Sequence, residues 1–256
     1  MNLEDKISLY YTSLTKSEKK VYQAVLKNPN TIVNNSIQKA AQLLKVSVAS
    51  IQRFISKIGY SGYTEFKLAL QHQEKDGSND SDQRKAKNPI VHAYIRSLKV
   101  VENLNLSLFL KPLIQDIEAH ENIKAIGNGN TALSAEQLVY SMYSENKFID
   151  CVDTSIKIDY LADALNKEDL LIIFSVTAPE DTYLKLIKSA RKVGAKTYLI
   201  TMNQESKLLN KVKHSIILPS THVENSDSSL HRVDSRAIFY IFAEMISYYY
   251  ANGFPD

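Results

Sequence analysis

The chain has 256 residues, a formal net charge of +3 and a single cysteine, Cys151. This length allows one large domain or two ordinary ones. One cysteine excludes an intramolecular disulfide, and six scattered histidines show no metal-ligand spacing, so we expect neither a metal nor a cofactor. We find no run of 18 apolar residues and no apolar secretion signal, and we therefore expect a cytoplasmic protein with no membrane partner.

Charge is distributed unevenly along the chain. Residues 1–75 contain 11 Lys and Arg against 5 Asp and Glu, whereas residues 76–256 contain 20 against 23. Basic residues clustered in one small region are typical of nucleic-acid-binding domains. The run EKDGSNDSDQRKAKN lacks large apolar side chains and indicates a linker. We predict an N-terminal domain over 1–75, a linker over 76–88 and a C-terminal domain over 89–256.

The N-terminal region has the pattern of a small all-helical domain of four or five helices. Thr15 and Glu18 have the spacing of a capping box, which predicts a helix that Pro29 ends. A later helix is expected to begin near Tyr63 or Thr64.

Between Ser36 and Gly59 the sequence predicts two short helices joined by a tight turn. The first repeats apolar residues at i, i+3, i+4 and i+7, the period of a buried helix face. The second begins after Ser47, a good helix cap, and has one apolar stripe: Val48, Ile51, Phe54, Ile55 and Ile58. Its opposite face carries Ala49, Gln52, Arg53, Ser56 and Lys57, with Ser50 at the edge.

A face of this kind suits a DNA major groove, because it combines small, hydrogen-bonding and cationic side chains. The layout is that of a helix-turn-helix. Arg53 is the best candidate for reading a base, since its planar fork can pair with two acceptors of guanine. Lys57 suits a phosphate contact. An α-hairpin with a solvated polar face remains the alternative, and Ser47 is equally explained as a helix cap.

Three motifs in order, L-T-x-S-E-x-K-V, S-I-x-x-A-A and V-S-x-A-S-I-x-R-F-x-x-K-I-G-Y-x-G-Y-x-E-F-K, span Leu14 to about Leu70. This series resembles the N-terminal domain of the RpiR/MurR family of bacterial transcription regulators. The resemblance implies binding to double-stranded operator DNA. It implies that the recognition helix contacts DNA through Ser47, Ser50, Arg53 and Lys57, and that the nearby backbone contacts come from Tyr60, Ser61, Tyr63 and Lys67.

From Ile123 onward, apolar strands alternate with helical segments, which predicts a parallel sheet covered by helices. The fold class is therefore α/β overall, an all-α helix-turn-helix bundle followed by an α/β sandwich. Expected strands are IKAIG, FIDCVD, DLLIIFSV, AKTYLITM and SIILP, and a polar loop is expected before a final helix over 232–250. Cys151 lies in the second strand and is better explained as a small core residue than as a nucleophile.

Two loops follow the first and third expected strands, where ligands of such sheets bind. In the first loop, Gly127 and Gly129 would let the backbone approach a ligand, and the next helix N-terminus attracts anions. The second loop offers hydroxyl groups that suit either a phosphate or simple helix capping. The predicted ligand contacts are Gly127, Gly129, Asn130, Thr131, Ser175, Thr177, Glu180 and Thr182.

Residues 107–250 resemble a sugar isomerase (SIS) domain, the usual effector-binding half of RpiR-type regulators. The family pattern G-x-G-x-S fits Gly127, Gly129 and Thr131 with a Ser-to-Thr change. The pattern S-x-S-G-x-T fits less well, because Ala178 replaces the glycine and Glu180 replaces the final threonine. A glutamate repels a phosphate unless it is paired or turned away. The effector is therefore a phosphorylated sugar, another polar metabolite, or absent from a degenerate domain that only dimerises.

The resemblance implies a transcription regulator of sugar metabolism that acts as a homodimer or tetramer and has no catalytic residues. The final helix, rich in tyrosine at 240 and 248–250, could form part of a dimer interface. By family analogy, the polar loop before this helix lies near the pocket, which makes Ser228, Ser229, His231 and Arg236 candidate ligand contacts. The alternative for this segment is an exposed loop with a helix cap. The alternative is a sugar-phosphate isomerase. It would need a general base, for which the candidates are His222, Glu224, His231 and Glu244.

Overall fold

The computed structural model describes residues 3–75, 88–221, 223–224, 230–231 and 236–254, so the predicted linker lies outside the described residues except for Asn88. The chain forms two compact units. The helical unit comprises residues 1–97 with 220–233, and the sheet unit comprises 98–219 with 234–256. Each unit is described separately below.

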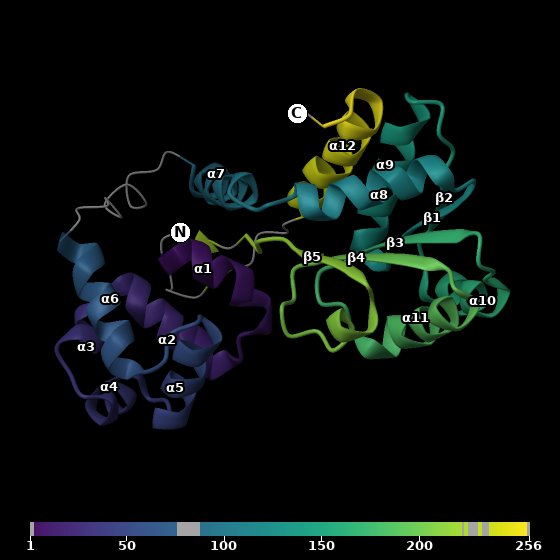
Figure 1. The fold of residues 1–256 in the computed structure, drawn as a ribbon. Coiled ribbons are helices and arrows are strands. Elements are labelled where there is room, and N and C mark those ends of the chain that lie inside the picture. The colour runs from purple at the N-terminus through teal and green to yellow at the C-terminus, as the bar shows by residue number, and fades with distance from the viewer. Residues whose placement is uncertain (1–2, 76–87, 222, 225–229, 232–235, 255–256) are drawn as a thin grey trace. The chain divides into compact units, whose positions relative to one another are not determined.

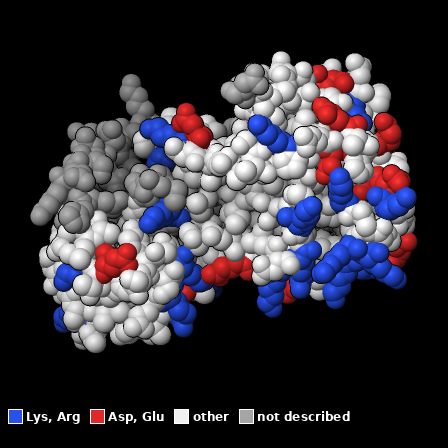
Figure 2. All heavy atoms as spheres, viewed as in Figure 1, with Lys and Arg blue, Asp and Glu red and all other residues white. Residues whose placement is uncertain are grey.

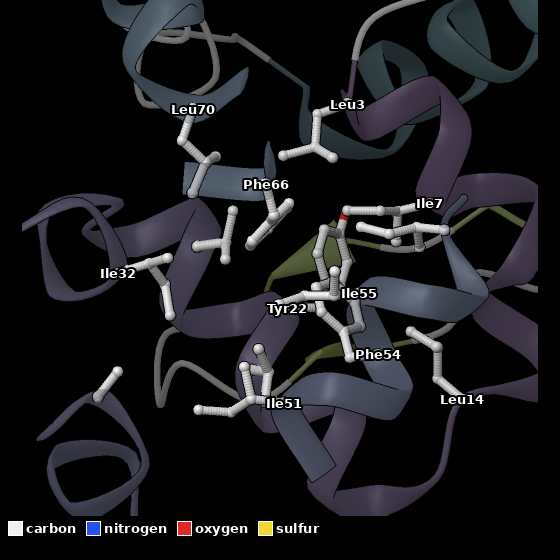
Figure 3. Close-up of a cluster of buried hydrophobic side chains, with 14 of the residues drawn as sticks. Leu3, Ile7, Leu14, Tyr22, Ile32, Ile51, Phe54, Ile55, Phe66 and Leu70 are labelled. Carbon is white, nitrogen blue, oxygen red and sulfur yellow. The ribbon is translucent and has the colours of Figure 1, made fainter. Parts of the chain in front are cut away.

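The helical unit contains a short bundle of helices (Figure 1). Its elements are α1 (Leu3–Tyr10), the 3₁₀ turn η1 (Tyr11–Ser13), α2 (Lys16–Lys27), α3 (Asn30–Val33), α4 (Ile37–Leu44), α5 (Val48–Lys57), α6 (Tyr63–Lys75) and most of α7 (Pro89–Glu102). Its core is built from apolar side chains of every helix from α1 to α6, among them Ile7, Tyr22, Ile32, Phe54 and Phe66 (Figure 3). Burial of this shared core stabilises helices that are individually too short to persist in water.

The predicted helix ends are present in the bundle. Thr15 and Glu18 form the capping box of α2, and Ser47 accepts the backbone N–H of Ser50 at 3.1 Å to cap α5. Between α4 and α5, Lys45 adopts a left-handed conformation with φ of 52°, which makes the turn tight. The expected number of helices was too low, since α1 and α3 were not recognised.

The sheet unit has five parallel strands in the order β2-β1-β3-β4-β5. These strands are β1 (Asn122–Ile126), β2 (Asp150–Val152), β3 (Asp169–Ser175), β4 (Lys196–Thr201) and β5 (His214–Ile217). All seven residues of β3 are buried, as expected for a central strand covered on both faces. The predicted parallel α/β architecture is confirmed.

Helices cover both faces of the sheet (Figure 1). One face carries α8 (Ser107–Ala119), α9 (Ala132–Tyr143) and α12 (Arg236–Asn252), and the other carries α10 (Ser155–Ala164) and α11 (Glu180–Val193). Short 3₁₀ turns, η3 (Gly129–Thr131) and η4 (Leu209–Lys211), lie in the loops. Where a helix was expected over 207–212, the chain forms only η4.

The polar segment expected to be a loop contains two short strands. β6 (Val223–Glu224) pairs with β7 (Leu230–His231) in antiparallel register. Each strand is only two residues long, so it leaves too little alternation for a sequence pattern to reveal it.

Positive charge also gathers on the sheet unit, although residues 76–256 are net acidic. Figure 2 shows Lys and Arg side chains over α10 and α11. The exposed cations of α11 are Lys185, Lys188, Arg191 and Lys192. Cations in the last turn of α11 are favourably placed against the partial negative charge of the helix C-terminus, which accounts for part of this patch.

Candidate DNA-binding face and effector pocket

The second helix of the predicted pair, α5, presents a polar arc. Ile51, Phe54, Ile55 and Ile58 are at most 1% exposed and pack into the core. Ser47, Ala49, Gln52, Arg53 and Ser56 are exposed. Because the buried stripe fixes the rotation of α5, the exposed residues form one continuous surface.

Arg53 has the most reach on this arc, with 61% of its side chain exposed. One terminal nitrogen donates to Ser50 Oγ at 3.3 Å, and its Nε lies 3.7 Å from Glu18 Oε1. Ser50 itself is only 4% exposed, and its hydroxyl also hydrogen-bonds Ser47 Oγ at 2.9 Å. Ser50, predicted to face DNA, therefore lies beneath Arg53 and supports it.

Lys57, predicted to contact a phosphate, lies largely inside the unit, with 18% of its side chain exposed. Its ammonium donates to the backbone oxygen of Ser13 at 3.0 Å and to Glu18 Oε2 at 3.1 Å. Burial alone would raise the pKa of Glu18, but hydrogen bonds from Thr15 and Lys57 outweigh this effect and lower that pKa. Lys57 thus joins α5 to α2 through a buried carboxylate.

The residues predicted to contact the DNA backbone lie around the start of α6. Ser61 is exposed, and both its N–H and its hydroxyl donate to Glu65. The Tyr63 hydroxyl donates to the backbone oxygens of Ile32 and Asn35. Tyr60 packs edge-on against Phe66 with a Lys6 ammonium 4.6 Å from its ring centre, and Lys67 is half-buried. Within this group, Ser61 is exposed and the other three residues are half-buried.

In the sheet unit, the two predicted ligand loops follow the carboxyl ends of β1 and β3. These strands are neighbours, and β1 has β2 on its other side. The strand order therefore reverses direction between β1 and β3. Ligands of such sheets bind at this point, beyond the carboxyl ends of the strands. The geometry brings together two loops that are more than 40 residues apart in sequence.

The first loop folds tightly over the end of β1. Thr131 is 7% exposed, and its hydroxyl donates to the backbone oxygen of Asn128 at 3.0 Å and accepts that residue's N–H at 3.1 Å. A Cβ on Gly127 would lie 2.3 Å from the backbone oxygen of Thr131, so only glycine fits there. Gly129 has φ of 59°, the left-handed region that favours glycine.

The second loop has a left-handed backbone at Ala178. Ala178, which stands at the expected glycine, has φ of 43°, and its N–H donates to Ser175 Oγ at 3.0 Å. A left-handed alanine costs about 1 kcal/mol. Ser206 Oγ donates to the backbone oxygen of Ala178 at 2.7 Å, and the Asn203 amide donates to that of Thr177 at 2.8 Å. These bonds hold the strained turn in place.

Tyr183, not identified from the sequence, lies near residues of both loops. It lies on α11, is 1% exposed, and its phenol is near Ser175 and Thr131, whose hydroxyls partly offset the effect of burial on its pKa. Burial raises the pKa of Tyr183, so the hydroxyl stays protonated at neutral pH. No local spacing marks Tyr183, because its partners lie on two other segments of the chain.

Nearby cations reduce the repulsion that Glu180 would exert on a phosphate. Glu180 is half-buried in the first turn of α11, and its carboxylate lies 3.4 Å from the Lys207 ammonium. With the Asn130 amide turned so that its oxygen faces Arg236, that oxygen accepts from both terminal nitrogens of Arg236, at 2.9 and 2.7 Å. Glu180 is thus paired, and a cation lies against the first loop. Thr182 is half-buried and donates to Asp181.

A separate cleft of about 630 Å³ lies at the amino ends of β4 and β5. It is lined by fifteen residues, including Asp116, Lys196, Tyr198 and His214, and none of the predicted ligand contacts lines it. The Asp116 carboxylate accepts from both Tyr198 and Lys196. Among the described residues, no group of three or more His, Cys, Asp or Glu could hold a metal ion. No described helix is long and apolar enough to cross a membrane.

Comparison with known proteins decides the family. A model described as "Helix-turn-helix domain, rpiR family" matches residues 1–77, and the SIS domain model matches residues 117–250. The chain belongs to the RpiR family. The "HTH-type transcriptional regulator GlvR" of Bacillus subtilis (strain 168) is a relative, 23% identical over 231 residues that cover 89% of this chain and 87% of GlvR.

Solved structures agree with the RpiR fold. The Vibrio vulnificus NanR protein, complexed with ManNAc-6P, matches with a TM-score of 0.51 and 18% identity, covering 93% of this chain and 85% of that one. A second structure, from Escherichia coli CFT073, matches with a TM-score of 0.55 and 17% identity, covering 68% of this chain and 92% of that one. At these identities the likeness shows the fold alone.

Proposed function

We propose that this RpiR-family chain is a DNA-binding transcription regulator of sugar metabolism whose SIS domain binds a sugar phosphate. In this proposal residues 1–75 bind operator DNA, residues 76–88 link the domains, and residues 89–256 bind the effector and dimerise. The observation that carries the DNA-binding part is the exposed arc of α5, with Arg53 at its centre and a rigid core behind it. The curated relatives named as transcription regulators support the same reading.

For DNA contacts we propose Arg53 as the base reader and Ser47 and Ser61 as nearby contacts. Ser47 and Ser61 are exposed and lie at the start of α5 and just before α6. Lys57 and Ser50 are assigned to positioning, because their polar atoms are bound within the unit. Tyr60, Tyr63 and Lys67 remain proposed backbone neighbours.

The proposed effector site is the edge formed by the loops after β1 and β3. Thr131 and Ser175 lie near the buried Tyr183 phenol, and α9 begins directly after the first loop. Helix N-termini favour anions, and the Arg236 cation beside Asn130 adds positive charge. The NanR protein, which shares this fold, is complexed with ManNAc-6P, and this supports a phosphorylated sugar as the ligand class.

We infer that this pocket binds its ligand without converting it. The side chains of His222, Glu224 and His231 lie outside the described residues, and Glu244 is exposed on α12. The relatives' names support a regulator. We also propose that the chain acts in the cytoplasm as a homodimer. A symmetric dimer would read two half-sites about 34 Å apart or at multiples of that distance.

The experiment is selection by the full chain from a pool of random-sequence DNA duplexes. We expect a recovered sequence with two-fold symmetry, to which Arg53→Ala binds about tenfold or more weakly. Lys20→Ala is the matched control, because it removes one exposed cation from α2 and leaves α5 intact. Equal binding by Arg53→Ala and the wild-type chain would reject the assignment of α5 as the reading helix.

A further inference from the structure

Glu18 has an oxygen atom whose hydrogen-bonding capacity is unused. The residue is fully buried, and its Oε2 accepts from the Thr15 N–H at 2.8 Å and from Lys57 at 3.1 Å. Within the described part of the chain, Oε1 is buried and has no hydrogen-bond partner. A buried carboxylate oxygen without a hydrogen bond costs free energy, so a hydrogen bond from any donor within reach would stabilise the unit.

Arg53 is the donor within reach. Its Nε lies 3.7 Å from Glu18 Oε1, and its terminal nitrogen already donates to Ser50 Oγ. A movement of the guanidinium by about 1 Å would bring Nε–H within hydrogen-bond distance of Oε1. Lys57 does not compete for this position, because it binds the other oxygen.

We propose that Glu18 is a positioning residue that fixes the guanidinium plane of Arg53 for base reading. This inference rests on the proposed DNA-binding function. Glu18 and Ser50 hold the Nε side of the fork, which leaves its remaining N–H groups to pair with two acceptors of one base. The capping box holds Glu18 rigidly at the start of α2, so the anchor does not move with the solvent-exposed arc.

The contact between Glu18 and Arg53 would increase base discrimination by holding the arginine side chain in place before DNA binds. A flexible arginine loses side-chain freedom when it pairs with a base, whereas a held one has lost that freedom already. Glu18 is buried and touches no DNA, yet it sets the discrimination at one base pair. Loss of Glu18 is therefore expected to reduce sequence preference more than general affinity for duplex DNA.

The test uses the full chain and the duplex pool, with Glu18→Gln, Arg53→Ala and the double variant. Glutamine keeps the size and can still serve the capping box. We expect both single variants to lose preference, by about tenfold, at the same base pair. The double variant should lose no more than Arg53→Ala alone, because one contact is removed either way.

Glu65→Gln is the matched control. It also removes one negative charge from the helical unit and lies outside the Arg53 network, but its carboxylate binds Ser61, a proposed DNA contact, so Glu65→Gln can change general affinity for DNA. We expect it to leave the base preference unchanged. Should Glu18→Gln fail to fold, Glu18→Gln/Lys57→Met removes both buried charges together and takes its place.

The outcomes separate the two levels of the proposal. A wild-type chain that enriches no sequence would reject the DNA-binding function itself. A wild-type motif that Glu18→Gln, or Glu18→Gln/Lys57→Met, reads with unchanged preference would reject the role of Glu18 and leave the DNA-binding function standing. Losses that add fully in the double variant would likewise reject a shared contact.

Discussion

At the scale of single residues, neighbouring cations on one helix face have different environments. Arg53 and Lys57 are four positions apart on α5, yet Arg53 is exposed and Lys57 is bound to buried Glu18. The capping pattern identified Glu18 from the sequence, but its second partner lies 39 positions away on another helix. Only the packing of α2 against α5 reveals that contact.

Replacing Lys57 with methionine should destabilise the helical unit by about 3 kcal/mol at neutral pH, because Glu18 would keep a buried charge without its main partner. Hydrogen exchange of the α2 and α5 amides in the full chain would measure this loss. Lys20→Met, on the exposed side of α2, should change the free energy of opening by less than about 0.5 kcal/mol.

The same loss should depend on pH. The pKa of Glu18 is lowered from its ordinary value of 4.5, so the carboxylate contributes stability above the unfolded pKa and loses it as pH falls through the folded pKa. The difference between wild type and Lys57→Met should therefore be largest at neutral pH and shrink towards pH 4.5 and below. A difference that stays constant over this range would contradict the ion-pair account.

At the scale of elements, strong periodicity identified the large helices and the five parallel strands. The five-residue apolar run at 170–174 in β3 and the capping signals of α2 and α5 were sufficient for their assignment. Short elements were missed for a physical reason. α3 has four residues and β6 has two, so tertiary packing decides their structure and local preference does not.

The effector loops were only partly predictable. The glycines and hydroxyls after β1 and β3 are visible in the sequence, and the parallel topology places them at one edge. The position of Tyr183 near both loops, the left-handed Ala178 and the pairing of Glu180 with Lys207 were not predictable, because each depends on long-range contacts or local backbone conformation.

The first loop offers a direct test at this scale. Gly127→Ala should lower the free energy of unfolding by about 2 kcal/mol, because its Cβ would lie 2.3 Å from the backbone oxygen of Thr131. Gly129→Ala should cost about 1 kcal/mol, since only its φ of 59° is unfavourable and nothing lies within 4 Å. Thermal denaturation of both variants measures these losses, and Gly127→Ala should have the lower melting temperature.

At the scale of the whole molecule, an aromatic cluster indicates where a second copy could bind. Tyr140, Tyr143 and Phe148 are 62%, 46% and 74% exposed, and adjacent rings lie 6.1 and 5.5 Å apart. Exposed aromatic clusters are typical of interfaces. Tyr248 of α12 is also exposed, on a helix that contacts α9 through Ser247 and Ser141.

Light scattering should give the wild-type chain twice its 29.0 kDa mass, and Phe148→Asp should move the population towards the single-chain mass. Tyr160→Asp is the matched control. Its ring is equally exposed, at 74%, on α10 against the opposite face of the sheet. A dimer unaffected by Phe148→Asp would exclude this cluster as the interface.

The most direct test of a regulator controlled by a phosphosugar is the affinity of the full chain for its selected duplex, measured with each hexose, pentose and amino-sugar phosphate and its unphosphorylated parent. We predict that one phosphosugar changes the dissociation constant by about fivefold or more, while its parent sugar does not. Arg236→Met should abolish that response and leave the affinity without effector unchanged. DNA affinity that is the same with every phosphosugar, or that responds equally to the parent sugar, would contradict the account.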